Sequence, residues 1–288
     1  MYDVALSVLA CVRANTAVHV AWQVDGGAAI STDALALTPG GGRIGSLLGG
    51  ALDDAILERV PSLGASGRLV RVPIGPLEAL TTDLDEGDIV HIALAPGDAI
   101  PEDIWEHLAE RRPVTFTIEV GEDGSFGSVV VADGETPASA DSSTLVCDLS
   151  PTPRALIVGG GPIGESLVAA FDVIGWAPIP VAGPGEASGI APTLAPIDAV
   201  VVMGHDVEMS GRSLQAAVGS RAGYIASLGS LAMQEHRRDW LAYRGVDWDP
   251  RIHGPAGLPI GARDPGEIAI SIVAEAIAAA RIEEPSNP

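Results

Sequence analysis

The sequence contains no lysine and few aromatic residues. All 16 basic residues among its 288 are arginines, against 38 Asp and Glu, so the formal net charge is −22. The phosphates of nucleic acids and anionic lipid headgroups repel a chain this acidic. These observations exclude non-specific binding of DNA, RNA or a membrane surface as the main function.

Cysteines and long apolar runs are also scarce. Cys11 and Cys147 are too few for a disulfide framework or a four-cysteine zinc site. A membrane span needs roughly 18 uninterrupted apolar residues, and the longest run, 268–280, is broken by Glu275. The first residues lack the basic segment of a signal peptide. We therefore expect a cytoplasmic protein without a membrane span or a bound metal.

The length fits two domains, and 47% hydrophobic residues can fill their cores. Residues 132–153 are rich in Ser, Thr, Pro and acid, with a short apolar patch around Cys147, which is typical of a linker. The sequence therefore predicts an N-terminal domain over 1–131, a linker over 132–153 and a C-terminal domain over 154–288.

Periodicity predicts a smaller mixed α/β domain at the N-terminus, with a partly antiparallel sheet. Helices are expected at 4–12, 51–59 and 101–110, and strands at 17–24, 69–72, 89–95, 114–120 and 128–131. The C-terminal half alternates short apolar strands with helices, at 154–158, 177–181, 199–203 and 224–227 for the strands and 165–174, 211–218, 231–244 and 265–281 for the helices. Such alternation predicts βαβ units, and hence a Rossmann-like doubly wound parallel sheet.

A glycine motif follows the first of these strands and opens a helix. It comprises Gly159, Gly161 and Gly164 at the spacing G-x-G-x-x-G, with Gly160, Pro162 and Ile163 between them. Such a loop lets a phosphate approach backbone N–H groups at the positive end of a helix. The motif therefore favours a phosphate-bearing ligand or a dinucleotide, and the alternative is a glycine-rich turn without a ligand.

The second strand has no acidic residue at its end, where dinucleotide folds hold the ribose hydroxyls. It ends at Val181, and Glu186 follows beyond a Pro-Gly turn. This absence weakens the case for NAD(P) in particular, but not for another ligand with a phosphate.

Polar residues follow the third and fourth strands. Gly204, His205 and Asp206 come after one, and Gly229 and Ser230 after the other. Parallel sheets bind ligands beyond the carboxyl ends of their strands, where a His-Asp pair can bind a ligand or transfer a proton. The alternatives are that Asp206 and Ser230 cap the following helices.

The segment 253–262 contains His253, Pro255 and Gly257, and its Gly and Pro residues define a rigid path. It lies against the ligand or simply leads into the last helix. That helix, 265–281, is apolar nearly all round, which predicts full burial or a subunit interface.

The C-terminal half resembles the XdhC/CoxI family, accessory proteins of molybdenum hydroxylases such as xanthine dehydrogenase. The resemblance extends from about 154 to 281 and is carried by the segments 156–164, 199–206, 224–230, 253–262 and 265–272, with a fainter match at 42–52. The family's Cys-Gly-Gly is absent, since 73–78 reads Pro-Ile-Gly-Pro-Leu-Glu, and Leu231 replaces the basic residue that often follows Gly-Ser.

The resemblance implies a homodimer that binds molybdenum cofactor (molybdopterin), assists its sulfuration and inserts it into an apo molybdenum hydroxylase. The residues Gly159–Gly164, Gly204, His205, Gly229, Ser230, His253, Pro255 and Gly257 would bind the cofactor. The alternative is an NAD(P)-dependent oxidoreductase that uses the same crevice, in which His205, Asp206 or His253 takes part in proton transfer. A third possibility is a fold retained to bind a partner.

Overall fold

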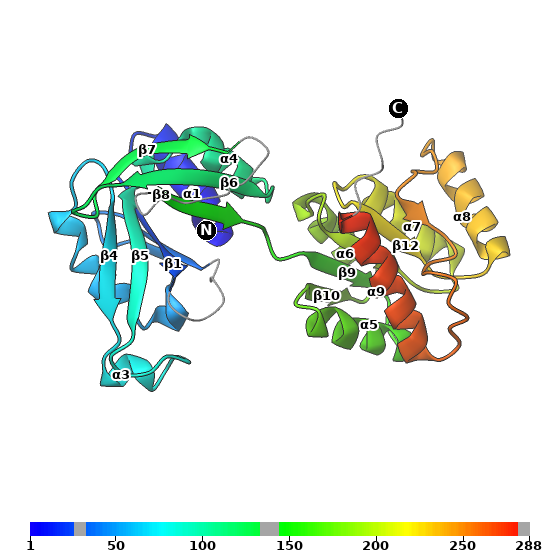
Figure 1. Ribbon diagram of the computed structural model, residues 1–288. Coiled ribbons are helices and arrows are strands. Elements are labelled where there is room, and N and C mark those ends of the chain that lie inside the picture. Colours follow the sequence, from blue (N-terminus) through cyan, green and yellow to red (C-terminus); the bar gives the residue numbers. More distant parts are fainter. Residues whose placement is uncertain (26–32, 133–143, 282–288) are drawn as a thin grey trace, which may run out of the picture. The chain divides into compact units, whose positions relative to one another are not determined.

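The computed structural model describes residues 1–25, 33–132 and 144–281. The chain forms two compact units, Met1–Pro151 and Thr152–Pro288 (Figure 1). Short 3-10 turns, at Leu48–Gly50, Val60–Ser62, Gly97–Ala99 and Ala191–Thr193, connect the main elements. None of the described helices has the length and apolar content that a membrane crossing requires.

The N-terminal unit contains two antiparallel sheets. The larger has the order β3-β2-β1-β5-β4 and the smaller the order β7-β6-β8. The elements are α1 (Tyr2–Arg13), β1 (His19–Asp25), β2 (Ala34–Leu37), β3 (Arg43–Gly45), α2 (Asp53–Leu57), β4 (Arg68–Pro73), α3 (Pro76–Ala79), β5 (Ile89–Pro96), α4 (Glu102–Ala109), β6 (Val114–Val120), β7 (Phe126–Val131) and β8 (Thr144–Leu149). The predicted mixed α/β character is confirmed.

The prediction of a linker over 132–153 is wrong for residues 144–149, which form a strand. Strand β8 lies within 132–153 and pairs with β6, with Cys147 opposite Phe116. Short flanking segments rich in Ser and Pro hid this strand, because its pairing partner lies about thirty residues earlier in the chain. Of the predicted linker, residues 133–143 lie outside the described residues.

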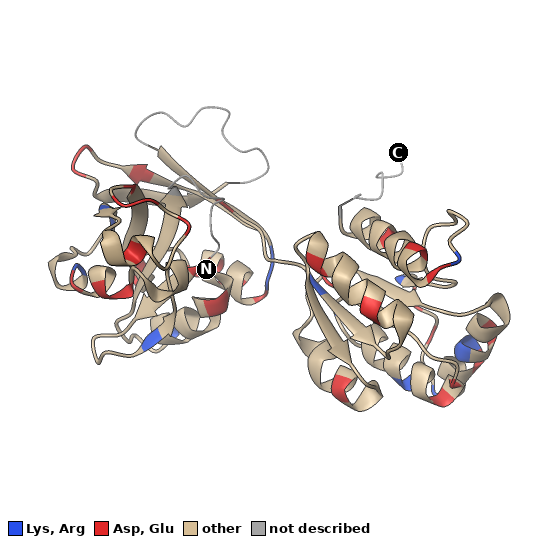
Figure 2. Cartoon of the chain, turned by 90° about the horizontal axis from the view of Figure 1, so that it is seen from below, with Lys and Arg blue, Asp and Glu red and all other residues tan. Residues whose placement is uncertain are grey.

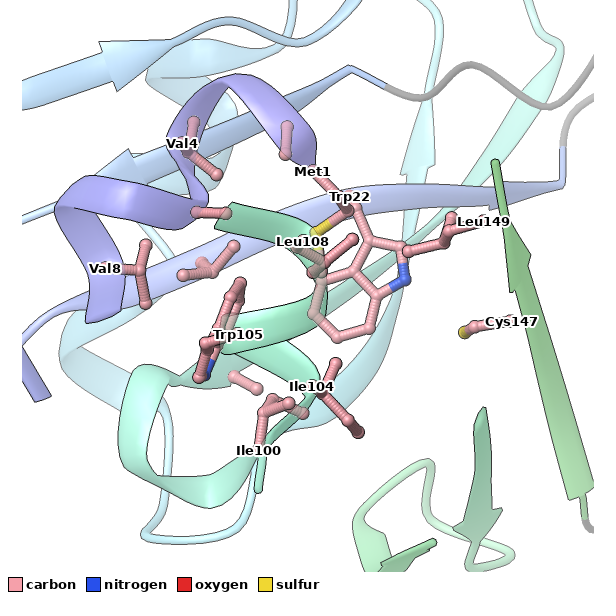
Figure 3. Packing of buried hydrophobic residues seen from close by; sticks show 14 of the residues in the cluster. Met1, Val4, Val8, Trp22, Ile100, Ile104, Trp105, Leu108, Cys147 and Leu149 are labelled. Atoms are coloured by element: carbon pink, nitrogen blue, oxygen red, sulfur yellow. The ribbon is translucent and has the colours of Figure 1, made fainter. Parts of the chain in front are cut away.

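The core of this unit joins α1 and α4 to one face of the larger sheet and to the smaller sheet. The rings of Trp22 in β1 and Phe116 in β6 meet edge to face, 6.4 Å apart. Cys147 is buried in the same cluster, and its side chain is directed toward Trp22 (Figure 3). The two sheets therefore share one interior.

The C-terminal unit is a five-stranded parallel sheet with the order β10-β9-β11-β12-β13. Its elements are β9 (Arg154–Val158), α5 (Pro162–Val173), β10 (Ala177–Val181), α6 (Pro184–Ile190), β11 (Ala199–Val202), α7 (Val207–Val218), β12 (Tyr224–Ser227), α8 (Leu231–Tyr243), β13 (Ile252–His253) and α9 (Pro265–Arg281). The predicted Rossmann-like sheet is confirmed.

Helices cover both faces of this sheet, because alternate side chains of each strand point to opposite sides. Ala155 and Ile157 of β9 pack with α5 and α9, whereas Leu156 and Val158 pack with α6, α7 and α8. The sequence predicted full burial of α9 as one alternative, but the structure leaves Ile270 57% exposed. The prediction of a subunit interface at α9 remains a prediction.

Acidic residues outnumber basic ones in both units (Figure 2). Residues 1–151 contain 23 Asp and Glu and 7 Arg, and residues 152–288 contain 15 and 9. The acidic positions are spread over several helices and loops. The net negative charge of each unit disfavours a negatively charged ligand, so such a ligand needs a site where the local groups attract an anion.

The buried thiol of Cys147 generates a prediction for the dependence of stability on pH. Burial raises the pKa of Cys147 from its ordinary value near 9 to about 12. Between these values the unfolded chain has lost the proton that the folded chain keeps, so the free energy of unfolding falls as the pH rises. Cys147→Ala should flatten this fall.

The measurement is urea unfolding of the wild type and of Cys147→Ala between about pH 8 and pH 11. Cys11→Ala is the control, since it removes the other thiol and should retain the slope of the wild type. Equal slopes for the wild type and Cys147→Ala would contradict the prediction.

Candidate functional site

A cavity of about 470 Å³ lies at the carboxyl edge of the parallel sheet. The strands β9, β11 and β12 are in register there, with Val158 beside Val202 and Val202 beside Ser227. The turns that follow these three strands therefore emerge side by side. We call this cavity the crevice, and its lining residues are Gly160, Pro162, Ile163, Met203, Gly204, His205, Leu228, Gly229, Pro255, Ala256 and Ile268.

The glycine loop between β9 and α5 forms one wall. Gly159 and Gly161 have φ angles of +111° and +81°, a region that residues with a side chain rarely adopt. A Cβ at Gly159 or at Gly164 would lie 3.3 or 3.2 Å from the side chain of Met203. These three glycines therefore shape the turn and permit close packing, and they do not line the crevice.

Gly160 has a different position in the loop. It lines the crevice, its φ lies outside the left-handed region, and a Cβ built on it meets no atom within 4 Å. In the described part of the chain, the amides of Gly160 and Gly161 have no hydrogen-bond partner. Helix α5 begins immediately afterwards at Pro162, so an anion at this loop would meet free N–H groups and the positive end of a helix.

The turn after β11 separates the two residues of the predicted His-Asp pair. His205 is exposed and lines the crevice. The Oδ1 atom of Asp206 accepts a hydrogen bond of 2.9 Å from the amide of Met209 and caps α7. Asp206 does not line the crevice, so the geometry favours the capping alternative for it.

The turn after β12 shows the same division. Gly229 lines the crevice, whereas the hydroxyl of Ser230 accepts a hydrogen bond of 3.4 Å from the amide of Met233 and caps α8. Sequence reasoning placed both residues at the ligand, and the structure brings only Gly229 to the crevice wall.

The segment after β13 contributes Pro255 and Ala256 to the crevice. Glu275 of α9 holds this segment in place. Its Oε2 atom accepts hydrogen bonds from the Tyr224 hydroxyl at 2.6 Å and from the Gly257 amide at 2.8 Å, and its Oε1 atom lies 3.3 Å from Nδ1 of His253. Burial and this carboxylate raise the pKa of Tyr224. His253 and Gly257 therefore anchor the segment and do not line the crevice.

Sequence reasoning missed the apolar lining residues and one buried cation. Met203, Leu228, Ala256 and Ile268 line the crevice. Arg237 of α8 is fully buried behind its wall. The signal for Arg237 was its position on the buried face of α8, three residues after Gln234 and four before Leu241, a spacing that places all three on one side of a helix.

The carboxylate of Glu186 lies at the end of β10. The Oε2 atom of Glu186, in the first turn of α6, accepts a hydrogen bond of 2.8 Å from the amide of Ala182. This contact places the carboxylate beside Ala182, the residue that follows β10. The sequence pattern suggested an absence there because Pro184 and Gly185, expected to form a turn, instead begin α6 and place Glu186 beside the end of the strand.

Within the described residues, no group of three or more His, Cys, Asp or Glu side chains could hold a metal ion. The residues that line the crevice include no Asp, Glu, Lys or Arg. Its titratable lining residue is His205, so binding there depends on backbone amides, apolar contacts and the field of nearby charges.

Comparisons with known proteins identify the C-terminal unit. Residues 155–276 match the family described as the XdhC Rossmann domain. A solved structure described as a xanthine dehydrogenase from Bacillus halodurans is 19% identical, with a TM-score of 0.45, over 100% of this chain and 98% of that one. A comparison with curated proteins gives no match. The C-terminal unit is therefore similar to XdhC Rossmann domains over residues 155–276.

Proposed function

We propose that this protein is an accessory factor that binds molybdenum cofactor and delivers it to an apo molybdenum hydroxylase. The observation that carries the proposal is the glycine loop of an XdhC Rossmann domain, whose free amides at Gly160 and Gly161 adjoin the crevice. The proposal includes a homodimer, as the family resemblance implies, and the cytoplasmic location expected from the sequence.

The crevice fits a ligand that combines a phosphate with a flat ring system. The loop amides and the start of α5 would hold the phosphate. Apolar side chains such as Ile163, Leu228 and Ile268 would cover the rings, and no carboxylate among the lining residues would repel the phosphate. The pterin brings its own sulfur ligands for molybdenum, so the protein's residues need only bind and orient this cargo.

The surroundings of His205 support binding rather than catalysis. A catalytic base usually has a third group that orients its ring. In the described part of the chain, the side chain of His205 has no hydrogen-bond or ion-pair partner. We therefore assign His205 a contact with the ligand and assign Asp206 the cap of α7.

One observation favours the alternative function, an NAD(P)-dependent oxidoreductase. The carboxylate of Glu186 lies beside Ala182, after the second strand of the sheet, where dinucleotide folds hold the ribose hydroxyls. The Oε1 atom of Glu186 is the one that would meet them, because Oε2 accepts the Ala182 amide. The two functions therefore make different predictions for Glu186.

The first test of this function concerns the glycine loop. Gly160→Val should place a branched side chain in the crevice without backbone strain, because φ at this position is unexceptional. We expect the affinity for molybdenum cofactor to fall at least tenfold, which is about 1.4 kcal/mol. Pterin fluorescence that coelutes with the protein on size-exclusion chromatography measures the bound fraction.

Gly189→Val is the matched control for Gly160→Val. Gly189 is exposed on α6, and a Cβ there also meets no atom within 4 Å. Its affinity should equal that of the wild type. Unchanged binding by Gly160→Val would show that the loop does not contact the ligand.

The second test separates the two functions. If molybdenum cofactor is the ligand, Glu186→Ala should leave its affinity within about twofold, because the pterin needs no ribose contact. If NAD(H) is the ligand, the same change should weaken NADH binding about tenfold or more. Calorimetric titration with each ligand measures both affinities. Glu235→Ala is the control, because it removes an exposed residue of equal charge. Binding of NADH alone, weakened in Glu186→Ala, would overturn the accessory function.

A further inference from the structure

Arg237 is a buried cation without a carboxylate partner. Its side chain lies on α8 and is 0% exposed. Within the described residues no Asp or Glu oxygen lies within ion-pair distance of it, although acidic residues are abundant in the chain. Buried charges are usually paired, since isolation from water costs free energy. Burial accordingly lowers the pKa of Arg237, but an arginine stays charged at neutral pH.

The guanidinium donates only to neutral oxygens. Nε donates to Oγ of Ser210 at 3.0 Å, and one terminal nitrogen donates to Oγ of Ser227 at 2.8 Å and to the carbonyl of Leu228. The other terminal nitrogen donates to the carbonyl of Gly204 at 2.7 Å. One side chain therefore holds the turns that follow β11 and β12, and its positive charge remains unneutralised.

These contacts determine which way two backbone amides face. In a trans peptide the carbonyl of one residue and the N–H of the next point in opposite directions, and both peptides are trans. The carbonyls of Gly204 and Leu228 point to Arg237, so the amides of His205 and Gly229 point away from it. All four residues line the crevice.

Neither of these amides has a hydrogen-bond partner in the part of the chain that the structure describes. The carbonyls that precede these amides accept from the two terminal nitrogens of one guanidinium, and His205 and Gly229 line the same crevice. A hydrogen bond to a charged donor also polarises each peptide group and strengthens its N–H as a donor.

We propose that the amides of His205 and Gly229 form a second anion-binding subsite of the crevice, oriented and charged by Arg237. Its ligand class is an oxyanion, either a second anionic group of the cofactor or a separate small oxyanion. The inference rests on the proposed function in so far as the crevice is the ligand site, and it adds a subsite distinct from the glycine loop.

The local charges favour an anion here despite the net charge of the protein. The lining residues include no carboxylate. The guanidinium contacts both peptides and is fully buried, where charges act strongly. Asp206 follows His205 directly in the chain, but its carboxylate accepts from the Met209 amide and is exposed to solvent, so its field is screened.

The test is a titration of the full-length protein with inorganic phosphate, followed by backbone amide NMR at constant ionic strength, with chloride as the reference. We expect phosphate to cause saturable chemical-shift changes of the His205 and Gly229 amides, and we expect chloride to cause none. The absence of such shifts would overturn the subsite, whatever happens at the glycine loop.

Variants then assign the role of Arg237. Arg237→Met should weaken phosphate binding at His205 and Gly229 at least tenfold, whereas Arg238→Met should not. Arg238 is the matched control, because it is the next residue of α8, has the same charge and is exposed against Trp248. Equal effects of the two variants would overturn the role of Arg237. If Arg237→Met does not fold, Arg237→Lys replaces it, since one ammonium group cannot reproduce the planar fork that spans both turns.

Gly160→Val separates this inference from the proposed function. It should abolish phosphate-dependent shifts in the glycine loop and leave those of His205 and Gly229 in place. Molybdenum cofactor that protects both sets of amides from phosphate would identify the oxyanion as part of the cofactor. Phosphate that still shifts His205 and Gly229 when the cofactor is bound would identify it as a separate ion.

Discussion

The register of three parallel strands is the constraint on which the rest of the site depends. Strands β9, β11 and β12 end at the same level, with Val158, Val202 and Ser227 side by side. Their side chains are buried on both faces of the sheet, so a shift of one residue would exchange the sides on which they pack. Because this register is firm, the turns that follow the strands must share one edge, and the crevice is the space between them.

Arg237 adds a second constraint at the same edge. The strand ladders align the turns along the sheet, but they do not determine the rotation of the peptides beyond the last pair. The guanidinium determines it by donating hydrogen bonds to the carbonyls of Gly204 and Leu228 and to two hydroxyls. An apolar residue could fill this space without the cost of burying a charge. An apolar residue could not orient the amides of His205 and Gly229 away from the interior, and it could not place a positive charge behind them.

Much of the fold was predictable because its signals are local. Short apolar strands, glycine turns and amphipathic helices identified the parallel sheet of the C-terminal unit and placed the glycine loop, His205 and Gly229 at its carboxyl edge. The exceptions depend on contacts that hydrophobic periodicity does not reveal. Strand β8 needs β6 to be recognised as a strand, and Glu186 returns to β10 through a hydrogen bond with Ala182. Neither contact leaves a periodic pattern in the sequence.

Side-chain identity also could not separate ligand residues from helix caps. Asp206 and Ser230 lie where a parallel sheet binds ligands, and the same positions directly precede the following helices, where a side chain can cap them. The structure distinguishes the two roles because the oxygens of both side chains already accept amides of their own helices. In the described part of the chain, the groups left free at this edge include the backbone amides of Gly160, Gly161, His205 and Gly229. Every residue except proline has such an amide, so its orientation, and not the residue type, makes it a binding group, and that orientation is set by the glycine angles on one wall and by Arg237 on the other.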